Sequence, residues 1–269
     1  MLLCALGLSA VAQQPQKGAA ARSLLRVCAD PDNLPLSNAD GSGFENRIAR
    51  LAADDLKRQL TMFWWPQRRG FLRRTLAAGE CDVVIGVPAG LERVLTTTPY
   101  YRSGYVLVTR ADDAAPLASL SDPRLARLRV GVQLIGNDLA ATPPGHVLAQ
   151  RGATQHVVGF TVFGDGPAAE RMVHALTERQ LDAALIWGPQ AGYFAHHAGA
   201  ALRVKVEPAP AGLALPFEFA IAMGVRRGDE ALRDALNRFI ERRRADIDAI
   251  LAEYNVPRTD LTATVGAAK

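Results

Sequence analysis

The feature of this sequence that most constrains its fold is the alternation of short apolar runs with amphipathic segments of helical period. Residues 81–87, CDVVIGV, are apolar almost throughout, which is typical of a strand buried on both faces of a parallel sheet. Such a sheet needs helices on both of its faces, so the alternation predicts an α/β fold. The predicted strands are 24–29, 61–65, 81–87, 128–133, 157–162, 181–187, 202–206 and 217–223.

Helices are predicted between several of these strands. Ser42-Gly43-Phe44-Glu45 has the S-x-x-E pattern of a capping box, with Ser42 as the N-cap. The helix that follows has one apolar face, made by Phe44, Ile48, Leu51, Ala52, Leu56 and Leu60. Further helices are predicted at 71–78 with Gly79 at the C′ position, from Asn137-Asp138, at 169–180 and, as one long helix, at 229–254.

The order of these elements predicts two α/β units, one inserted in the other. Linker-like segments lie near 110–116 and 206–213. We therefore expect a discontinuous first lobe, 23–110 with 213–269, and an inserted second lobe, 111–212. Two Rossmann-like lobes joined by a two-segment hinge would form a central cleft between the carboxyl ends of their strands, where α/β proteins bind ligands.

The first twelve residues, MLLCALGLSAVA, predict a cleavable signal peptide. They are apolar or small and end in Ala10-Val11-Ala12, an A-x-A cleavage pattern. Residues 13–22 are then expected to be a flexible N-terminus, and the mature protein to be periplasmic. The alternative, a buried N-terminal helix, is disfavoured because the segment has no polar face and ends in Gln13-Gln14-Pro15.

Export would leave two cysteines, Cys28 and Cys81, each in or beside an apolar strand-like run. A pair of cysteines in an oxidising compartment suggests a disulfide, which could form if the two strands are neighbours. Two buried free thiols are an equally good interpretation, because cysteine often packs as a small hydrophobic residue. Neither cysteine has the surroundings of a catalytic nucleophile, since no histidine motif accompanies it.

Composition and motifs exclude several classes of function. Charged residues make up 22% of the chain and the net charge is only +4, so a nucleic-acid partner is not predicted. No apolar run reaches the roughly 18 residues of a membrane span. His196-His197 is an adjacent pair and not an i, i+4 pair, so a shared metal ion is not expected. We expect a monomer that is not an enzyme and holds no cofactor or metal.

Six segments spread over the chain carry a family resemblance: 81–86, 91–93, 97–101, 104–108, 129–133 and 181–184. They are similar to the type II periplasmic solute-binding proteins, the extracytoplasmic partners of ABC importers. The resemblance covers nearly the whole mature chain. It implies a two-lobed binding protein and, as one possible function, the substrate-binding component of an ABC transporter for a small polar or aromatic solute.

Four further segments narrow the resemblance: 26–35, 43–46, 65–71 and 186–194. They are similar to the binding proteins associated with quinoprotein dehydrogenases, of the MxaJ/XoxJ type. This resemblance implies a periplasmic accessory factor for a PQQ-dependent methanol or alcohol dehydrogenase. Its role would be to assist maturation or activation of that enzyme by protein–protein interaction, with a small-molecule ligand as a further possibility.

The resemblance also identifies departures from an amino-acid receptor. Arg93 matches the arginine that would hold an α-carboxylate, although it could instead pair with Glu92. After the strand 181–187, where such receptors carry an aspartate for the ammonium group, this chain has Trp187 followed by Gly188-Pro189. In place of a Gly-Thr turn it has Asn137-Asp138, and Asp138 would cap its helix and repel a carboxylate.

The expected cleft is therefore rich in aromatic residues and poor in the paired charges that bind a zwitterion. For each aromatic residue, core packing is the alternative interpretation, and for Arg68 a solvated loop is the alternative to a partner contact. The candidate ligand or partner residues are Asp30, Asn33, Trp65, Arg68, Arg93, Tyr100, Asn137, Asp138, Trp187 and Tyr193.

Overall fold

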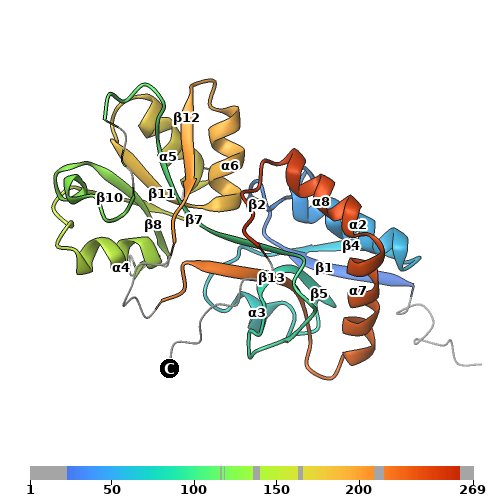
Figure 1. The fold of residues 1–269 in the computed structure, drawn as a ribbon. Coiled ribbons are helices and arrows are strands. Elements are labelled where there is room, and N and C mark those ends of the chain that lie inside the picture. Colours follow the sequence, from blue (N-terminus) through green and yellow to red (C-terminus); the bar gives the residue numbers. More distant parts are fainter. Residues whose placement is uncertain are drawn as a thin grey trace, which may run out of the picture.

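The computed structural model describes residues 23–115, 117, 119–135, 140–162, 166–208 and 215–260. Figure 1 shows two α/β halves side by side, joined by long strands that run between them. The expected signal peptide and flexible N-terminus lie outside the described residues, as do Asn137, Asp138 and part of the second linker.

The first half contains the amino-terminal strands and helices. Its elements are β1 (Leu24–Ala29), β2 (Asp32–Asn33), β3 (Ser37–Asn38), α2 (Phe44–Asp55), β4 (Gln59–Trp64), α3 (Phe71–Arg74), β5 (Val83–Pro88) and β6 (Leu95–Thr96). β1 pairs in parallel with β4 and with β5. Phe44, Ile48 and Ala52 on α2 are fully buried in the same apolar cluster as strand residues of this half, so the helix covers one face of the sheet.

Two antiparallel strands, β7 (Tyr101–Arg110) and β13 (Glu218–Val225), carry the sheet from one half to the other. Residues 101–104 of β7 pair with β13. Residues 105–110 pair with the second-half strands β11 (Ala183–Trp187) and β12 (Leu202–Val206). The result is a single 11-stranded sheet whose main path runs β10-β8-β11-β7-β13-β5-β1-β4.

The second half repeats the α/β pattern. Its elements are η1 (Pro123–Arg127), β8 (Val130–Ile135), β9 (Ala140–Ala141), α4 (Pro143–Gln150), β10 (Val157–Thr161), α5 (Ala168–Thr177), β11, α6 (Gly188–His197) and β12. β8 pairs in parallel with β10 and β11. β11 ends at Trp187, directly before Gly188-Pro189, and α6, which the sequence did not predict, begins there because a proline in the first helical turn is a favoured way to begin a helix.

The start of α2 differs from the predicted capping box by one residue. Gly43, not Ser42, is the N-cap, and Asn46 Oδ1 accepts the backbone N–H groups of Gly43 and Asn38 at 3.0 and 2.9 Å. Asn46 thus performs the role that the sequence pattern assigned to Glu45. The Glu45 side chain is thereby released from capping, and Leu60, predicted on the helix, lies in β4.

Two predictions around β5 were also only partly right. β5 pairs in parallel with β1 but antiparallel with β13, so its buried apolar run does not have two parallel neighbours. The helix predicted at 71–78 ends at Arg74, and turns continue from there. Gly79 has a φ of 80°, the left-handed conformation that a C′ glycine provides.

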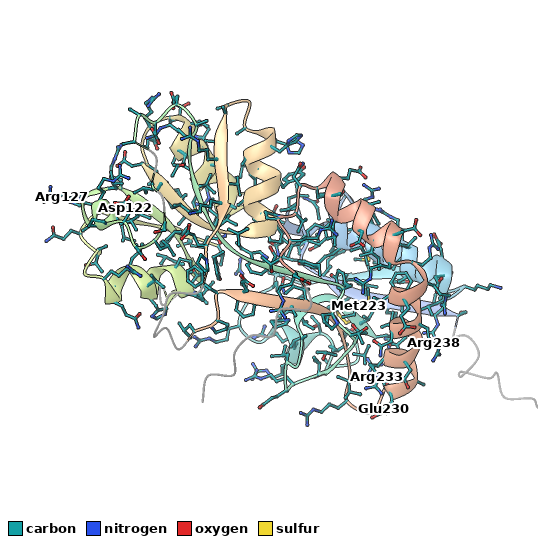
Figure 2. All side chains as sticks on the ribbon, in the orientation of Figure 1. Asp122, Arg127, Met223, Glu230, Arg233 and Arg238 are labelled. Atoms are coloured by element: carbon teal, nitrogen blue, oxygen red, sulfur yellow. A yellow bond between two sulfur atoms is a disulfide. The ribbon has the colours of Figure 1, made fainter. Side chains whose placement is uncertain are left out.

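The predicted long C-terminal helix is two helices, α7 (Glu230–Arg242) and α8 (Arg244–Glu253). Arg242 pairs with Asp55 at the end of α2, whereas Arg244 Nη1 donates to the carbonyl oxygen of Tyr100 at 2.7 Å. These two bonds reach different parts of the first half, and the helix is interrupted between them at Arg243. In Figure 2, Arg238 on α7 lies at the outer edge of the molecule, whereas Met223 of β13 belongs to the buried core.

Cys28, near the end of β1, and Cys81, just before β5, form a disulfide with their Cα atoms 5.5 Å apart. Both residues are buried in a small apolar cluster that includes Phe71, Leu76 and Val84. The bond joins positions 53 residues apart, so it closes most of the first α/β repeat covalently.

Candidate functional site

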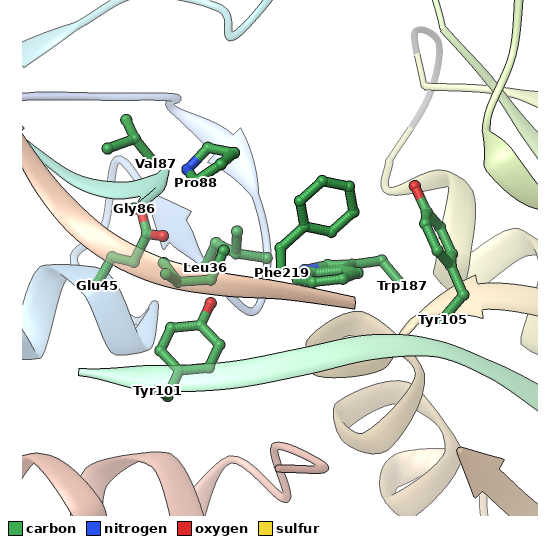
Figure 3. Close-up of a pocket in the computed structure, with 10 residues that line it drawn as sticks. Leu36, Glu45, Gly86, Val87, Pro88, Tyr101, Tyr105, Trp187 and Phe219 are labelled. Atoms are coloured by element: carbon green, nitrogen blue, oxygen red, sulfur yellow. The ribbon is translucent and has the colours of Figure 1, made fainter. Parts of the chain in front are cut away.

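An apolar pocket of about 220 Å³ lies where the two halves meet (Figure 3). Its walls come from the carboxyl ends of β5 and β11, the first turn of α2 and the crossing strands β7 and β13. We call it the aromatic pocket. Its lining residues are Leu36, Glu45, Gly86, Val87, Pro88, Tyr101, Tyr105, Trp187, Phe219 and Ile221. The position agrees with the general rule that α/β proteins bind ligands beyond the carboxyl ends of their strands.

Trp187 forms the wall that belongs to the second half. Its ring meets those of Tyr105 and Phe219 edge-on, with centroids 5.5 and 5.8 Å apart. Trp187 is the last residue of β11 and the N-cap of α6, so a strand and a helix together fix its position. Among the aromatic residues predicted for the cleft, Trp187 is the one that lines this pocket.

Glu45 is the one carboxyl group among these lining residues. It is only 8% exposed, and its Oε1 has no hydrogen-bond partner among the described residues. Burial, reinforced by the nearby charge of Asp30, raises the pKa of Glu45 to about 7. A carboxyl group with a raised pKa therefore lies in an otherwise apolar and aromatic environment.

Gly86 allows Glu45 to lie against β5. A Cβ atom at position 86 would overlap Glu45 Oε1, so only glycine leaves room for the carboxyl group there. Tyr101 lies opposite on β7, and Figure 3 shows its hydroxyl pointing toward the interior of the pocket. Burial, reinforced by the charge of Glu45, raises the pKa of Tyr101 well above its ordinary value, so its hydroxyl keeps its proton and can donate.

Asp30 directly follows β1, and Asn33 is the second residue of β2. The Asp30 carboxylate accepts the backbone N–H groups of Asp32 and Gln67, at 2.9 and 2.5 Å. Asn33 Nδ2 donates to Gln67 Oε1 at 3.3 Å. These bonds fasten the turns after β1 to the loop after β4, so both residues have a clear role in local structure.

Asn33 also belongs to a chain of side-chain amides that connects the two halves. Gln190 Nε2, in α6, donates to Asn33 Oδ1 at 3.3 Å. Gln133 Nε2, in β8, donates in turn to Gln190 Oε1 at 2.9 Å. We call Gln67, Asn33, Gln190 and Gln133 the amide chain. It begins in the first half and ends beside the backbone of Trp187, whose N–H lies 3.5 Å from Gln133 Oε1.

A second cavity, of about 210 Å³, shares Gly86, Val87 and Pro88 with the aromatic pocket. We call it the basic pocket because three arginines line it: Arg68, Arg73 and Arg93. Arg93, the predicted carboxylate ligand, therefore lies in this neighbouring cavity and is not among the residues that line the aromatic pocket.

Three other predicted aromatic residues lie elsewhere. Tyr100 is corrected to a core residue: it is 0% exposed, and its hydroxyl donates to the carbonyl oxygen of Ile85 at 3.1 Å. Trp65 packs beside the disulfide cluster, with the Arg74 guanidinium 5.7 Å from the centre of its ring. Tyr193 stacks on Tyr254 at 5.8 Å, in the contact between α6 and the end of α8.

Sequence reasoning missed most of the aromatic pocket: Glu45, Gly86, Tyr101, Tyr105 and Phe219 were not candidates. One signal could have indicated it. Gly86 interrupts an apolar strand, and a glycine at such a position often marks the close approach of another group. Glu45 was assigned to helix capping, which concealed its role in the pocket.

Within the described ranges, no helix is long and apolar enough to cross a membrane. No three His, Cys, Asp or Glu side chains in those ranges are close enough together to share a metal ion.

The fold and the aromatic pocket are those of an α/β binding protein whose candidate site lies between two halves. The chain belongs to the bacterial extracellular solute-binding proteins, family 3, whose family model matches residues 25–257. Protein MoxJ from Methylorubrum extorquens AM1 is 36% identical over 248 residues, which cover 87% of this chain and 81% of that protein.

Two solved structures are similar over most of the chain. The periplasmic binding protein XoxJ from Methylobacterium extorquens AM1 is 36% identical, with a TM-score of 0.73 over 88% of this chain and 99% of that one. MxaJ from Methylophaga aminisulfidivorans MPT is 26% identical, with a TM-score of 0.77 over 87% of this chain and 100% of that one. The type II binding-protein fold expected from the sequence is confirmed, and so is the resemblance to proteins of the MxaJ/XoxJ type.

Proposed function

We propose that this chain is a periplasmic accessory protein for a PQQ-dependent methanol or alcohol dehydrogenase. It would assist maturation or activation of that enzyme by binding to it. The observation that carries the proposal is the similarity to MoxJ and XoxJ over almost nine-tenths of the chain. The sequence resemblance associates this type of binding protein with quinoprotein dehydrogenases.

The chemistry of the aromatic pocket supports a function other than capture of a free amino acid. A zwitterion needs a cation for its carboxylate and an acid from the opposite lobe for its ammonium group. Trp187 stands at the end of β11, where the resemblance places that acid, and Arg93 lines the basic pocket instead. A protein segment that enters both adjoining pockets, with an acidic side chain near the three arginines, would suit them better.

The proposed docking surface is formed by the aromatic and basic pockets, which meet at Gly86, Val87 and Pro88. Trp187 lies on one side of this junction and Arg68 on the other. Tryptophan and arginine are enriched among the residues that dominate protein–protein binding energy. The partner segment would place one side chain against Trp187 in the aromatic pocket and a carboxylate near the arginines of the basic pocket.

The proposed location is the periplasm, reached by way of a signal peptide at residues 1–12 that is removed. The disulfide between Cys28 and Cys81 supports this location, because such bonds persist in oxidising compartments and are rare in the cytosol. The division into a first lobe (23–110 with 213–269) and an inserted second lobe (111–212) is likewise a proposal. β7 and β13 would be the strands about which the lobes move.

Binding to the dehydrogenase from the same periplasm tests the proposal. The tagged mature protein should recover the enzyme, and its addition to newly assembled enzyme should increase the active fraction. Trp187→Ala and Arg68→Ala should each weaken binding by about tenfold or more. Arg151→Ala, an exposed position after α4, is the matched control and should bind like the wild type.

Circular dichroism on each variant separates loss of binding from loss of fold. Failure of the folded wild-type protein to bind or activate the enzyme under any condition would remove the proposal. If Trp187→Ala, Arg68→Ala and Arg151→Ala all bound the enzyme equally well, the dehydrogenase would remain the partner but the proposed docking surface would be rejected.

A second candidate function is that of a transport receptor for a small polar or aromatic solute. The observation that favours it is the pocket itself, which holds one buried carboxyl group among aromatic rings. A ligand present at 100 times its dissociation constant should stabilise the protein by about 2.7 kcal/mol. A thermal-shift screen over organic acids, alcohols, amino acids and amines measures this directly, and no shift for any of them would count against a transport role.

A further inference from the structure

The aromatic pocket contains an unsatisfied acidic group. Glu45 is more than nine-tenths buried, and its Oε1 has no hydrogen-bond partner among the described residues. Buried polar groups normally have such partners, because an unpaired carboxylate in an apolar environment loses its hydration without compensation. Glu45 lines the cavity, and Figure 3 shows its carboxyl group beside Gly86.

The other walls of the pocket are suited to a positive charge. Tyr101, Tyr105, Trp187 and Phe219 surround the cavity, and the faces of aromatic rings attract cations. No lysine or arginine is among the lining residues, so no protein cation competes for Glu45 there. An anionic ligand would meet the Glu45 carboxylate and the nearby charge of Asp30, and both would repel it.

The size of the cavity limits the ligand. Its volume of about 220 Å³ is below the ~300–1,000 Å³ of pockets that hold drug-sized molecules. A group of several heavy atoms fits this space. No arginine lines this pocket, so an amino acid would find no partner there for its carboxylate.

We propose that the aromatic pocket binds an organic ammonium group, with Glu45 as its counter-ion and the rings of Trp187, Tyr101, Tyr105 and Phe219 around it. This inference rests on the pocket alone and does not require a dehydrogenase partner. The same chemistry has two sources: a free small amine, or the side chain of a lysine on a protein segment that enters the pocket.

Isothermal titration of the mature protein at pH 8 tests the proposal with matched pairs of probes. Choline is compared with 3,3-dimethylbutan-1-ol, and butylammonium with 1-butanol, since each pair differs mainly in charge. Nα-acetyl-lysine amide is compared with Nα-acetyl-norleucine amide to represent a partner side chain. At least one cation should bind at least ~10-fold more tightly than its neutral counterpart.

Glu45→Gln keeps the size of the side chain and removes its charge. It should weaken binding of the cationic probe by about 30-fold or more and leave binding of the neutral probe unchanged. Glu92→Gln, at an exposed position, is the control and should bind like the wild type. Trp187→Leu should also weaken binding of the cation, although leucine keeps this wall of the pocket apolar.

Each outcome of these titrations either supports or overturns the proposed ammonium site. Binding of choline or butylammonium alone identifies a small-molecule site, and binding of the lysine derivative alone identifies a side-chain site; both support the proposal. Equal binding of charged and neutral probes would show a merely apolar pocket, and unchanged binding by a folded Glu45→Gln variant would remove Glu45 as the counter-ion. Absence of binding by all three cations at millimolar concentration would overturn the proposal.

Discussion

Arg26 in β1 and Asp82 before β5 are joined by a fork of hydrogen bonds, with Arg26 Nε and Nη2 donating to the two carboxylate oxygens at 3.1 and 2.6 Å. The second half contains the same arrangement between Arg129 and Asp182, at 3.2 and 2.8 Å. In both pairs the backbone N–H of the arginine also donates to the aspartate. The two halves thus secure their first and third parallel strands by the same contact.

The first prediction concerns Asp82, whose carboxylate also pairs with Arg226 at 3.1 Å. Burial opposes ionisation of Asp82, but hydrogen bonds from Arg26 and Arg226 outweigh it and hold its pKa below the ordinary value. Asp82→Asn should lower the free energy of unfolding at pH 7 by about 1–3 kcal/mol. Because the folded pKa is depressed, this stabilisation is lost as pH falls through it, so the deficit should shrink in acid.

Urea denaturation at pH 7 and at pH 3 measures both parts of this prediction. Asp248→Asn is the control, because the side chain of Asp248, which pairs with Arg258, is 40% exposed whereas that of Asp82 is 14% exposed. It should change the free energy of unfolding by less than about 1 kcal/mol. An equal effect of the two variants would show that the Arg26–Asp82 fork stabilises the fold no more than an exposed ion pair does.

The second prediction concerns the buried carboxyl group of Glu45, whose pKa rises from 4.5 to about 7. Between these two pH values the unfolded chain releases the Glu45 proton and the folded protein keeps it. This group therefore makes stability fall as pH rises through that window, by roughly 3 kcal/mol in total. Glu45→Gln should remove this loss, so the variant should be more stable than the wild type at pH 8.

Chemical denaturation at several pH values from 4 to 8 follows this difference. Glu92→Gln, an exposed change of the same kind, should not alter the pH profile. If the free energy of unfolding of the wild type changed with pH between 5 and 8 no more than that of Glu45→Gln, the raised pKa of Glu45 would be contradicted.

The third prediction concerns the disulfide, which links positions 53 residues apart. Closing a loop of this length restricts the unfolded chain and stabilises the folded state by up to about 4 kcal/mol. The double variant Cys28→Ser, Cys81→Ser should lose a large part of that stability. Both cysteines are buried, so native protein should resist alkylation under mild reductant and react only when denaturant is added.

The fourth prediction concerns the amide chain between the halves. Gln190→Ala removes the bonds to Asn33 and Gln133, each worth about 0.5–1.5 kcal/mol net. We expect the two halves to separate more readily, which small-angle scattering would record as a larger radius of gyration. Gln180→Ala, at an exposed turn after α5, is the control. An unchanged radius for Gln190→Ala would show that other contacts hold the halves together.

The alternation of apolar runs was sufficient to predict most of the sheet. β1 occupies the predicted residues 24–29, because its apolar run is bounded by a turn signal at Asp30-Pro31. β10 and β11 lie within their predicted ranges for the same reason. Local patterning determines where such a strand begins and ends, so these strands could be predicted without knowing which strands they pair with.

The pocket could not be predicted in the same way, because it depends on which side chain points where. Tyr100 and Tyr101 are adjacent and chemically alike, yet one is core and the other lines the pocket. Because α2 begins one residue later than predicted, Asn46 and not Glu45 completes the helix cap, and the Glu45 side chain lines the pocket instead. β7, which was not predicted, pairs with β13 in the first half and with β11 and β12 in the second, and this link between the halves depends on its partners.

The crossing strands have a consequence for any ligand. Tyr101, Tyr105, Phe219 and Ile221 belong to β7 and β13, so the ribbon that connects the halves is also a wall of the aromatic pocket. Twisting this ribbon changes the distances across the cavity, and a molecule that fills the cavity resists the twist. Occupancy and the angle between the halves are therefore thermodynamically linked: whatever fixes one biases the other by the same free energy.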